Sequence, residues 1–298
     1  MVLQSARMIK LPLAITTICV LSIFNSFAQN RAPLRTTFLS QLRNEDASGS
    51  VAVQRFDIRG GVPLIQQEGN LIALGARYAF DQYDFEGTTA DWDNVNNADV
   101  GLAWRWQFSD RWLWANYGAL SLGLEESVDF SDGLKFNHIS VLEYKWNDHL
   151  IIGPGIGIAD KINQGITVFP ILAFQWYIND GLLFGSGPSD VSATGANIFL
   201  EYTPESLGKN WVFTTGVSYS DNTFALANAG SVARSGEERL GSAYGAVSYK
   251  WNNGAKLSLI GGYHFFQSFE TFNGDGDLLS KEILEDAPYL GVSFGVEF

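Results

Sequence analysis

The sequence predicts an all-β protein, a transmembrane antiparallel up-and-down β-barrel of about 14 strands that forms a single domain. Residues 290–298 alternate strictly between large apolar side chains and small or polar ones, the pattern of a strand with one apolar and one polar side. Mean hydropathy is close to zero, as it is in a barrel whose two faces alternate. The longest apolar run after residue 28 covers only 166–174 and contains Pro170, so it is too short for a spanning helix.

The first 28 residues have the organisation of a secretory signal peptide. Lys10 precedes an apolar core at 11–24, and Ser-Phe-Ala at 26–28 forms a small-x-small cleavage site. We therefore expect residues 1–28 to be removed on export, which leaves residues 29–298 as one barrel domain.

Removal of residues 1–28 would take away two basic residues, Arg7 and Lys10, and no acidic one, so the formal net charge would change from −13 to −15. A chain this acidic is not expected to bind nucleic acid. The single cysteine, Cys19, lies within the signal peptide, and the mature chain is therefore expected to have no thiol and no disulfide. No cofactor is predicted.

Alternating segments separated by turns predict the strands of the barrel. A weak first strand at 34–42 is implied, because bacterial single-chain barrels normally have an even number of strands. The short segment at 182–187 decides between 14 strands and a fallback of 12. In chain order the expected strands are 34–42, 51–63, 70–81, 98–108, 112–124, 135–146, 149–158, 165–178, 182–187, 192–203, 211–221, 240–251, 255–267 and 288–298.

The connections between these strands alternate between short and long. Long connections rich in acidic residues, at 83–97, 125–134, 222–239 and 268–287, are expected to face outward. The short connections carry hairpin-turn residues and are expected to face the periplasm. They are Ser109-Asp110, Asn147-Asp148, Asn179-Asp180-Gly181 and Asn252-Asn253-Gly254.

Tryptophan is concentrated beside the predicted periplasmic turns, and Trp92 is the exception. Indole rings favour the headgroup level of a bilayer, so tryptophans at one depth indicate an aromatic girdle. The alternative is that these aromatic residues flank the turns of a large soluble β-sandwich. The predicted girdle consists of Trp104, Trp106, Trp112, Trp114, Trp146, Trp176, Trp211 and Trp251.

The alternating C-terminal strand that ends in Phe298 resembles the closing strand of Gram-negative outer-membrane β-barrels. In those proteins the terminal Phe is part of the signal read by the barrel-assembly machinery. The resemblance implies location in the outer membrane of a Gram-negative bacterium. It also implies the assembly machinery, outer-membrane lipids and lipopolysaccharide as partners.

Charged residues are predicted to gather on one part of the lumen wall. Strand alternation points Arg55, Asp57, Arg59, Arg77 and Arg105 inward from three adjacent strands. A row of arginines inside a pore attracts anions and sets selectivity. The favoured alternative is that the arginines pair with acidic residues such as Asp57 or Asp81 and stabilise the wall.

The strand at 149–158 carries Gly153, Gly155 and Gly157 on one face, which either makes room in the lumen or relieves strand curvature. Together with Phe169-Pro170-Ile171 and Trp176, this pattern resembles an uncharacterised outer-membrane barrel family related to the phenol-degradation meta-pathway channels. The resemblance covers residues 51–298 and implies passage of small, hydrophobic molecules.

His138 and Ser140 are two residues apart on one face of a predicted strand. The pair resembles the His-x-Ser motif of outer-membrane phospholipases and lipid A deacylases, in which the histidine activates the serine. In those families Asn and a small residue follow, whereas Val141 and Leu142 follow here. The favoured interpretation is therefore a surface His and Ser without catalytic role.

The connection at 271–282 partly matches an EF-hand calcium loop. Asn273, Asp275 and Glu282 stand where such a loop has ligands, but Thr271 replaces the first Asp and strands flank the segment. A solvated acidic outer loop, bridged by divalent cations to lipopolysaccharide, is the favoured alternative.

The sequence leaves three candidate functions. A passive or loop-gated channel for small hydrophobic or anionic solutes is favoured, and the protein is not expected to be an enzyme. A structural or surface-interaction barrel with a filled lumen comes second. A lipid-modifying hydrolase is the third.

Overall fold

The computed structural model describes residues 33–43, 49–67, 69–187, 191, 195–227 and 234–297. The signal peptide and Phe298 lie outside the described residues, and their expected roles stay predictions. Within the described part of the chain, no helix is long and apolar enough to cross a lipid bilayer.

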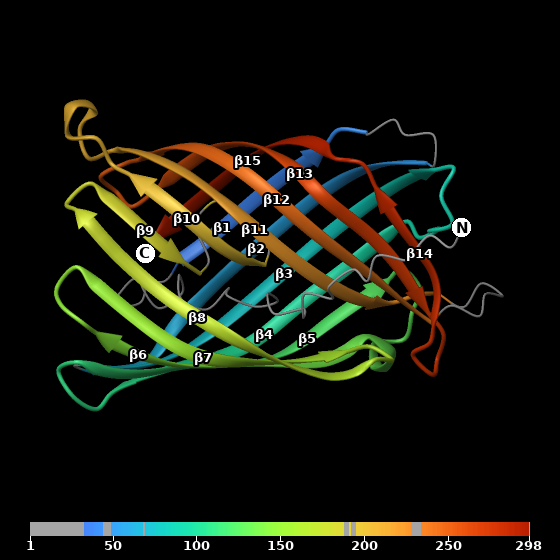
Figure 1. The fold of residues 1–298 in the computed structure, drawn as a ribbon, viewed down its shortest axis with the longest axis horizontal. Coiled ribbons are helices and arrows are strands. Elements are labelled where there is room, and N and C mark those ends of the chain that lie inside the picture. The colour runs from blue at the N-terminus through green and yellow to red at the C-terminus, as the bar shows by residue number, and fades with distance from the viewer. Residues whose placement is uncertain are drawn as a thin grey trace, which may run out of the picture.

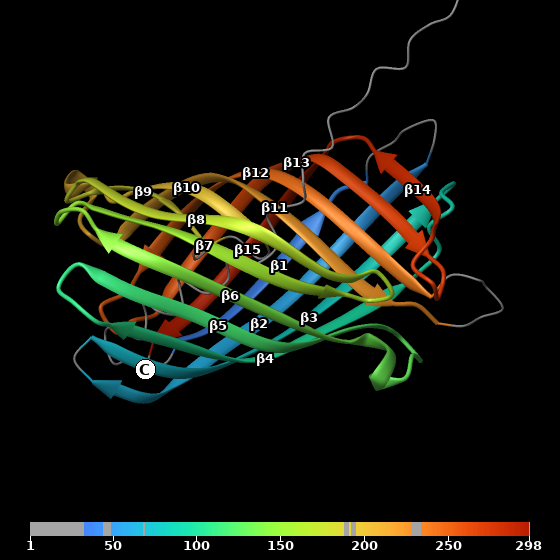
Figure 2. The same cartoon turned by 60° about the horizontal axis from the view of Figure 1, so that its bottom comes forward.

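Fourteen antiparallel strands form a closed barrel, as predicted (Figures 1 and 2). Each strand from β1 to β13 pairs with the next, β13 pairs with β15, and β15 pairs with β1 to close the wall. The wall strands are β1 (Pro33–Gln41), β2 (Ser50–Gln67), β3 (Asn70–Glu86), β4 (Asn94–Gln107), β5 (Trp112–Glu125), β6 (Leu134–Lys145), β7 (Leu150–Lys161), β8 (Gly165–Asn179), β9 (Leu182–Ser186), β10 (Ala196–Tyr202), β11 (Trp211–Ala225), β12 (Ser235–Lys250), β13 (Lys256–Phe272) and β15 (Ala287–Glu297).

The implied first strand and the short segment after residue 181 are both present, as β1 and β9, so the fallback of 12 strands is wrong. An additional strand, β14 (Leu278–Leu284), was not predicted, and among the described residues it pairs only with β13. Several strands also extend into the predicted outer loops, as β3 does to Glu86 and β13 to Phe272. Their outer ends carry acidic residues such as Asp84, Glu86 and Glu270, and in the sequence they therefore resemble polar loops.

Most of the short connections lie at one end of the barrel, together with the start of β1 and the end of β15; we call this the turn end and the opposite one the loop end. The short connection between β7 and β8, at 162–164, lies at the loop end. All four predicted hairpin turns are at the turn end. In one of them, Asn147 Oδ1 accepts hydrogen bonds of 2.8 Å from the backbone amides of His149 and Leu150. In the same turn Lys145 donates a 2.7 Å bond to the exposed Asp148 and lowers the pKa of that carboxyl.

The outer wall is apolar, and the inner wall is polar or small, along the predicted closing strand β15. Leu290 and Phe294 are 65% and 48% exposed on the outside, while Ser293 faces inward and bonds to Thr37 at 2.9 Å. Exposed tryptophans at the strand ends and turns of the turn end are Trp106, Trp112, Trp114, Trp146, Trp176, Trp211 and Trp251, with Trp104 half-buried beside them. Their role as a membrane girdle stays a prediction.

Small residues of β7 make room for side chains from the neighbouring strands. A Cβ on Gly157 would lie 2.2 Å from the ring of Phe169, and one on Gly153 or Gly155 would lie within 3 Å of Val141. Phe169 and Val141 belong to an apolar cluster on the inner faces of β3 to β8. The glycine row therefore serves packing of the inner wall.

Candidate functional site: a cationic wall beneath an inward flap

A row of charged residues crosses the inner wall from β1 to β6. Successive strand pairings place Arg35 opposite Arg59, Arg59 opposite Arg77, Arg77 opposite Asp99, Asp99 opposite Ser121, and Ser121 opposite Lys135. Barrel strands are tilted by roughly 35–45°, so such a row climbs along the wall. It begins near the turn end, close to the start of β1, and finishes near the loop end, at the start of β6.

Acidic residues stabilise the like charges of this row, which would otherwise repel each other across adjacent strands. Asp57 is 2% exposed and accepts hydrogen bonds from both Arg59, at 2.8 Å, and Arg77. Arg77 also bonds to Asp99 at 3.2 Å. The structure places these residues on the inner side of the wall and pairs them with acidic residues, and their role in selectivity stays a prediction.

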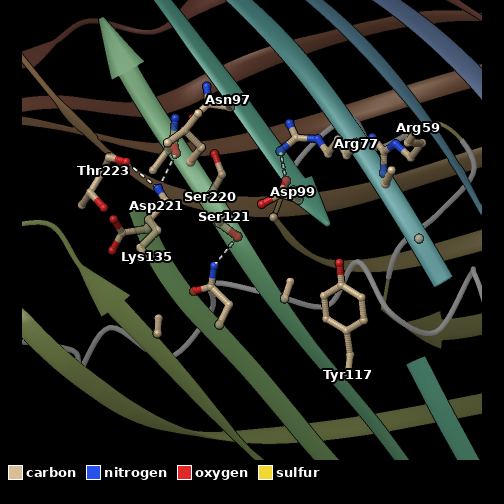
Figure 3. Close-up of a pocket in the computed structure, with 18 of the residues that line it drawn as sticks. Arg59, Arg77, Asn97, Asp99, Tyr117, Ser121, Lys135, Ser220, Asp221 and Thr223 are labelled. Atoms are coloured by element: carbon tan, nitrogen blue, oxygen red, sulfur yellow. Dashed lines mark hydrogen bonds and ion pairs between the residues drawn. The ribbon is translucent and has the colours of Figure 1, made fainter. Parts of the chain in front are cut away.

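The row lines a cavity of about 190 Å³ (Figure 3). Strands β1 to β6 contribute five basic residues to its lining and only two acidic ones, Asp81 and Asp99. Tyr117, Ala119 and Ala159 form a less polar part of the lining. The basic residues are Arg35, Arg55, Arg59, Arg77 and Lys135. The cavity is therefore cationic along this wall.

Arg105, which the sequence placed in the same group, lies apart from this cavity. It faces inward closer to the turn end and lies 3.8 Å from Glu143 on β6. Sequence reasoning missed Arg35, Lys135 and Lys161, because all three stand within two residues of a strand end, where a basic residue is normally solvated.

Three strands leave the wall at the loop end and fold inward; we call residues 220–225 of β11, 235–241 of β12 and 266–272 of β13 the flap. Pairing of β11 with β10 stops at Tyr219, and pairing of β13 with β15 stops at His264. A register shift next to Gly241 marks the same level on β12. Because bulges bend strands, this irregularity favours the turn into the lumen.

One face of the flap is bound to β2 and β3. Glu238 is 2% exposed and accepts a 2.5 Å bond from Arg55, a 2.9 Å bond from Tyr83 and a 3.1 Å bond from Gln267. Arg55 also lies 3.4 Å from Asp81. A buried carboxylate needs such partners, so this contact fixes the flap to the wall.

The opposite face of the flap is bound to β7. Lys161 donates hydrogen bonds of 2.7 Å to Asp221 and 2.8 Å to Glu237, and both carboxylates are fully buried. Gln164 donates a 3.0 Å bond to Glu237, and Arg239 lies 2.6 Å from the same carboxylate. Contacts on two faces show that the flap lies inside the barrel and is not a continuation of its wall.

The tip of the flap reaches β5 and β6 on the far side. Ala225 at the end of β11 pairs in parallel with Leu124 of β5, and Figure 1 shows the two strand ends side by side. Lys135 donates to the backbone oxygen of Thr223 (Figure 3). Phe224 packs edge-on against Trp92 at 5.2 Å between ring centroids. The flap thus roofs the cavity at the loop end.

His138 and Ser140 lie on the outer face of β6, and no hydrogen bond joins them within the described residues. Ser140 accepts a 2.8 Å bond from the indole of Trp114, and the His138 ring lies beside that of Trp104. Asn116, opposite Ser140 on β5, is 1% exposed and lacks a hydrogen-bond partner among the described residues. The pair therefore does not form an activated serine in this structure.

The connection between β13 and β14 is a tight turn around Asn273. Its side-chain oxygen accepts bonds from the amides of Asp275, at 3.0 Å, and Asp277, at 2.8 Å. Glu282 instead accepts a bond from the amide of Thr89. Among the described residues, no group of three or more His, Cys, Asp or Glu is placed to hold a metal ion.

The sequence matches no protein-family model and no curated protein. Among solved structures, an outer membrane channel from Pseudomonas putida F1 is similar with 5% identity and a TM-score of 0.49, over 90% of this chain and 96% of that one. The toluene transporter TodX of P. putida is similar with 9% identity and a TM-score of 0.44, over 92% and 91%. The KdgM porin is similar with 10% identity and a TM-score of 0.34, over 87% and 98%. Likeness at this level carries no information on what this chain binds.

Proposed function

We propose that the protein is an outer-membrane channel for small anionic solutes, with the flap closing its loop end in the state described here. The observation that carries the proposal is the row of basic residues on β1 to β6. These residues line one cavity, and acidic residues of the same strands balance them only in part. Arginine and lysine side chains along a pore favour anions over cations.

Location in a membrane is supported by the outer surface of the barrel. Leucine, isoleucine, valine and phenylalanine side chains are exposed around the wall, and exposed tryptophans concentrate at the turn end. Apolar side chains facing outward and aromatic residues at the interface are the features of outer-membrane barrels. The turn end would face the periplasm, with the flap at the cell surface.

Passage of an uncharged hydrophobic solute is less favoured, because seven of the residues that line the cavity from β1 to β6 are charged. An anion would interact with Lys135 near the loop end and with Arg77, Arg59 and Arg35 in turn toward the turn end. Each step along such a row exchanges one charge-assisted hydrogen bond for another.

Single-channel recordings of the refolded chain in a planar bilayer test the proposal. With a salt gradient across the bilayer, the reversal potential gives the anion-to-cation permeability ratio. The wild type is expected to prefer anions, and the preference should fall in an Arg59→Gln, Arg77→Gln double variant. Arg105→Gln is the matched control, because Arg105 faces the lumen outside the cavity lining. Equal ratios in all three proteins would reject the role given to Arg59 and Arg77, and a wild type without anion preference would reject the anion channel.

A structural or surface-interaction barrel is the second candidate, and the flap favours it because it occupies the mouth of the lumen. The same recordings separate the two functions. A barrel that inserts stably yet stays silent after the flap contacts are removed would support this second function.

A further inference from the structure

We propose that the flap is a gate operated by the permeant anion, which competes with flap carboxylates for Arg55 and Lys161. This inference rests on the proposed function and adds to it a binding site and a mode of regulation. Both basic residues line the cavity, and both are bound to the flap from opposite sides.

The flap carboxylates lie in the cavity itself. Glu238 and Asp221 line the same cavity as the cationic row. Glu238 of β12 bonds to Arg55 of β2, and β13, β15 and β1 lie between these two strands in the wall. Asp221 of β11 bonds to Lys161 of β7, and β8, β9 and β10 lie between them. The flap thus places its own carboxylates where a permeating anion would find its cationic partners.

The flap has few backbone pairings to the rest of the barrel. Within the described residues, β11 beyond Tyr219 pairs only with β12, apart from the single pairing of Ala225 with Leu124. On the other side of the flap, β13 beyond His264 pairs with β14 and no longer with β15. Apart from the Ala225–Leu124 pairing and the pairing of β13 with β14, the flap is therefore joined to the barrel by its continuation from the wall strands and by side-chain contacts.

A permeating anion would compete directly with the flap carboxylates. An anion in the cavity offers oxygen acceptors to Arg55 and Lys161 that can replace those of Glu238 and Asp221. Release of both carboxylates breaks one ion pair on each face of the flap, Arg55–Glu238 and Lys161–Asp221, and the anion also competes with Glu237 for Lys161. A ligand shifts a conformational equilibrium by its difference in affinity for the two states, and an anion binds better where these cations are not already paired. The anion would therefore favour the open state.

Open probability in a planar bilayer tests the gate, with inorganic phosphate replacing chloride at constant ionic strength. The wild type is expected to open several-fold more often as phosphate replaces chloride. A Glu238→Gln, Asp221→Asn double variant should already be open in chloride and should lose the dependence on phosphate. Glu205→Gln, which neutralises an exposed carboxylate at the turn end, is the matched control and should behave as the wild type does.

The outcomes separate this inference from the proposed function. A channel that prefers anions but opens equally in chloride and phosphate would overturn the gate and leave the anion channel intact. Absence of anion preference in every variant would overturn the proposed function itself. Where the double variant does not refold, the phosphate response of the wild type decides the question alone.

Discussion

Arg55 of β2 donates a 2.5 Å hydrogen bond to Glu238 of β12, although three strands of the barrel wall separate them. The bond is possible only because the outer end of β12 leaves the wall and enters the lumen. It thereby links the cationic wall to the element that covers it. Tyr83 and Gln267 complete the hydrogen bonds of the same carboxylate.

Replacement of Arg55 by Met should loosen the flap. Glu238 would keep two neutral partners but lose its buried cation, and breaking a buried ion pair costs about 3–5 kcal/mol. Because the lost ion pair stabilises the flap and not the whole barrel, backbone amides in 220–225 and 235–241 should exchange hydrogen faster, while exchange in β15 should be unchanged. Equal protection of the flap in variant and wild type would contradict the role given to this bond.

Gly157→Ala should destabilise the barrel, whereas Gly245→Ala should not. A Cβ at 157 would overlap the ring of Phe169, while one at 245 has no atom within 4 Å. Overpacking typically costs about 1–3 kcal/mol, so the Gly157 variant should unfold at lower urea concentration in lipid vesicles. Identical unfolding midpoints for both variants would show that the inner wall beside Gly157 accommodates a methyl group, contrary to the close packing of the Phe169 ring.

Two tryptophans should respond differently to lipids that carry a bromine quencher. Trp176 is 47% exposed on the outer wall, and Trp92 is 2% exposed in the cluster beneath the flap. In variants that keep only one of them, fluorescence of Trp176 should be quenched by brominated acyl chains and that of Trp92 should not. Strong quenching of Trp92 would be inconsistent with its place inside the barrel.

Ser140→Ala should lower stability slightly and leave conductance unchanged. The change removes the acceptor for the Trp114 indole, and one such hydrogen bond contributes about 0.5–1.5 kcal/mol. Urea unfolding and single-channel current measure the two effects. His138→Ala serves as the companion variant, and loss of a lipid-hydrolysing activity in both would revive the hydrolase interpretation.

Much of the wall could be predicted because the apolar outer face and the polar inner face of a barrel impose a strict alternation. The closing strand containing Leu290 and Phe294 follows that pattern, and hairpin residues such as Asn147 locate the turns. The inward direction expected for Arg59 and Arg77 came from the same alternation, since a one-residue shift would place them on the apolar outer face.

The flap could not be predicted in this way. Both Glu237 and Glu238 are buried, one against β7 and the other against β2, so neighbouring residues of one strand are enclosed on both faces. The alternation of apolar and polar residues then cannot indicate which face is buried. A segment with charged residues on both faces resembles a solvated loop. The pairing of Lys161 with Asp221 likewise depends on where the flap folds, which local pattern does not determine.

A reversible disulfide between the flap and the wall tests whether the flap closes the lumen. Ser235 Oγ lies 3.4 Å from the backbone oxygen of Ile162, so a Ser235→Cys, Ile162→Cys variant would join the flap to the β7–β8 connection and keep its ion pairs. Oxidised channels are expected to stay closed in phosphate, and a reducing agent should restore openings to the wild-type level. Equal conductance before and after reduction, with the disulfide verified by mass spectrometry, would show that the flap does not close this barrel.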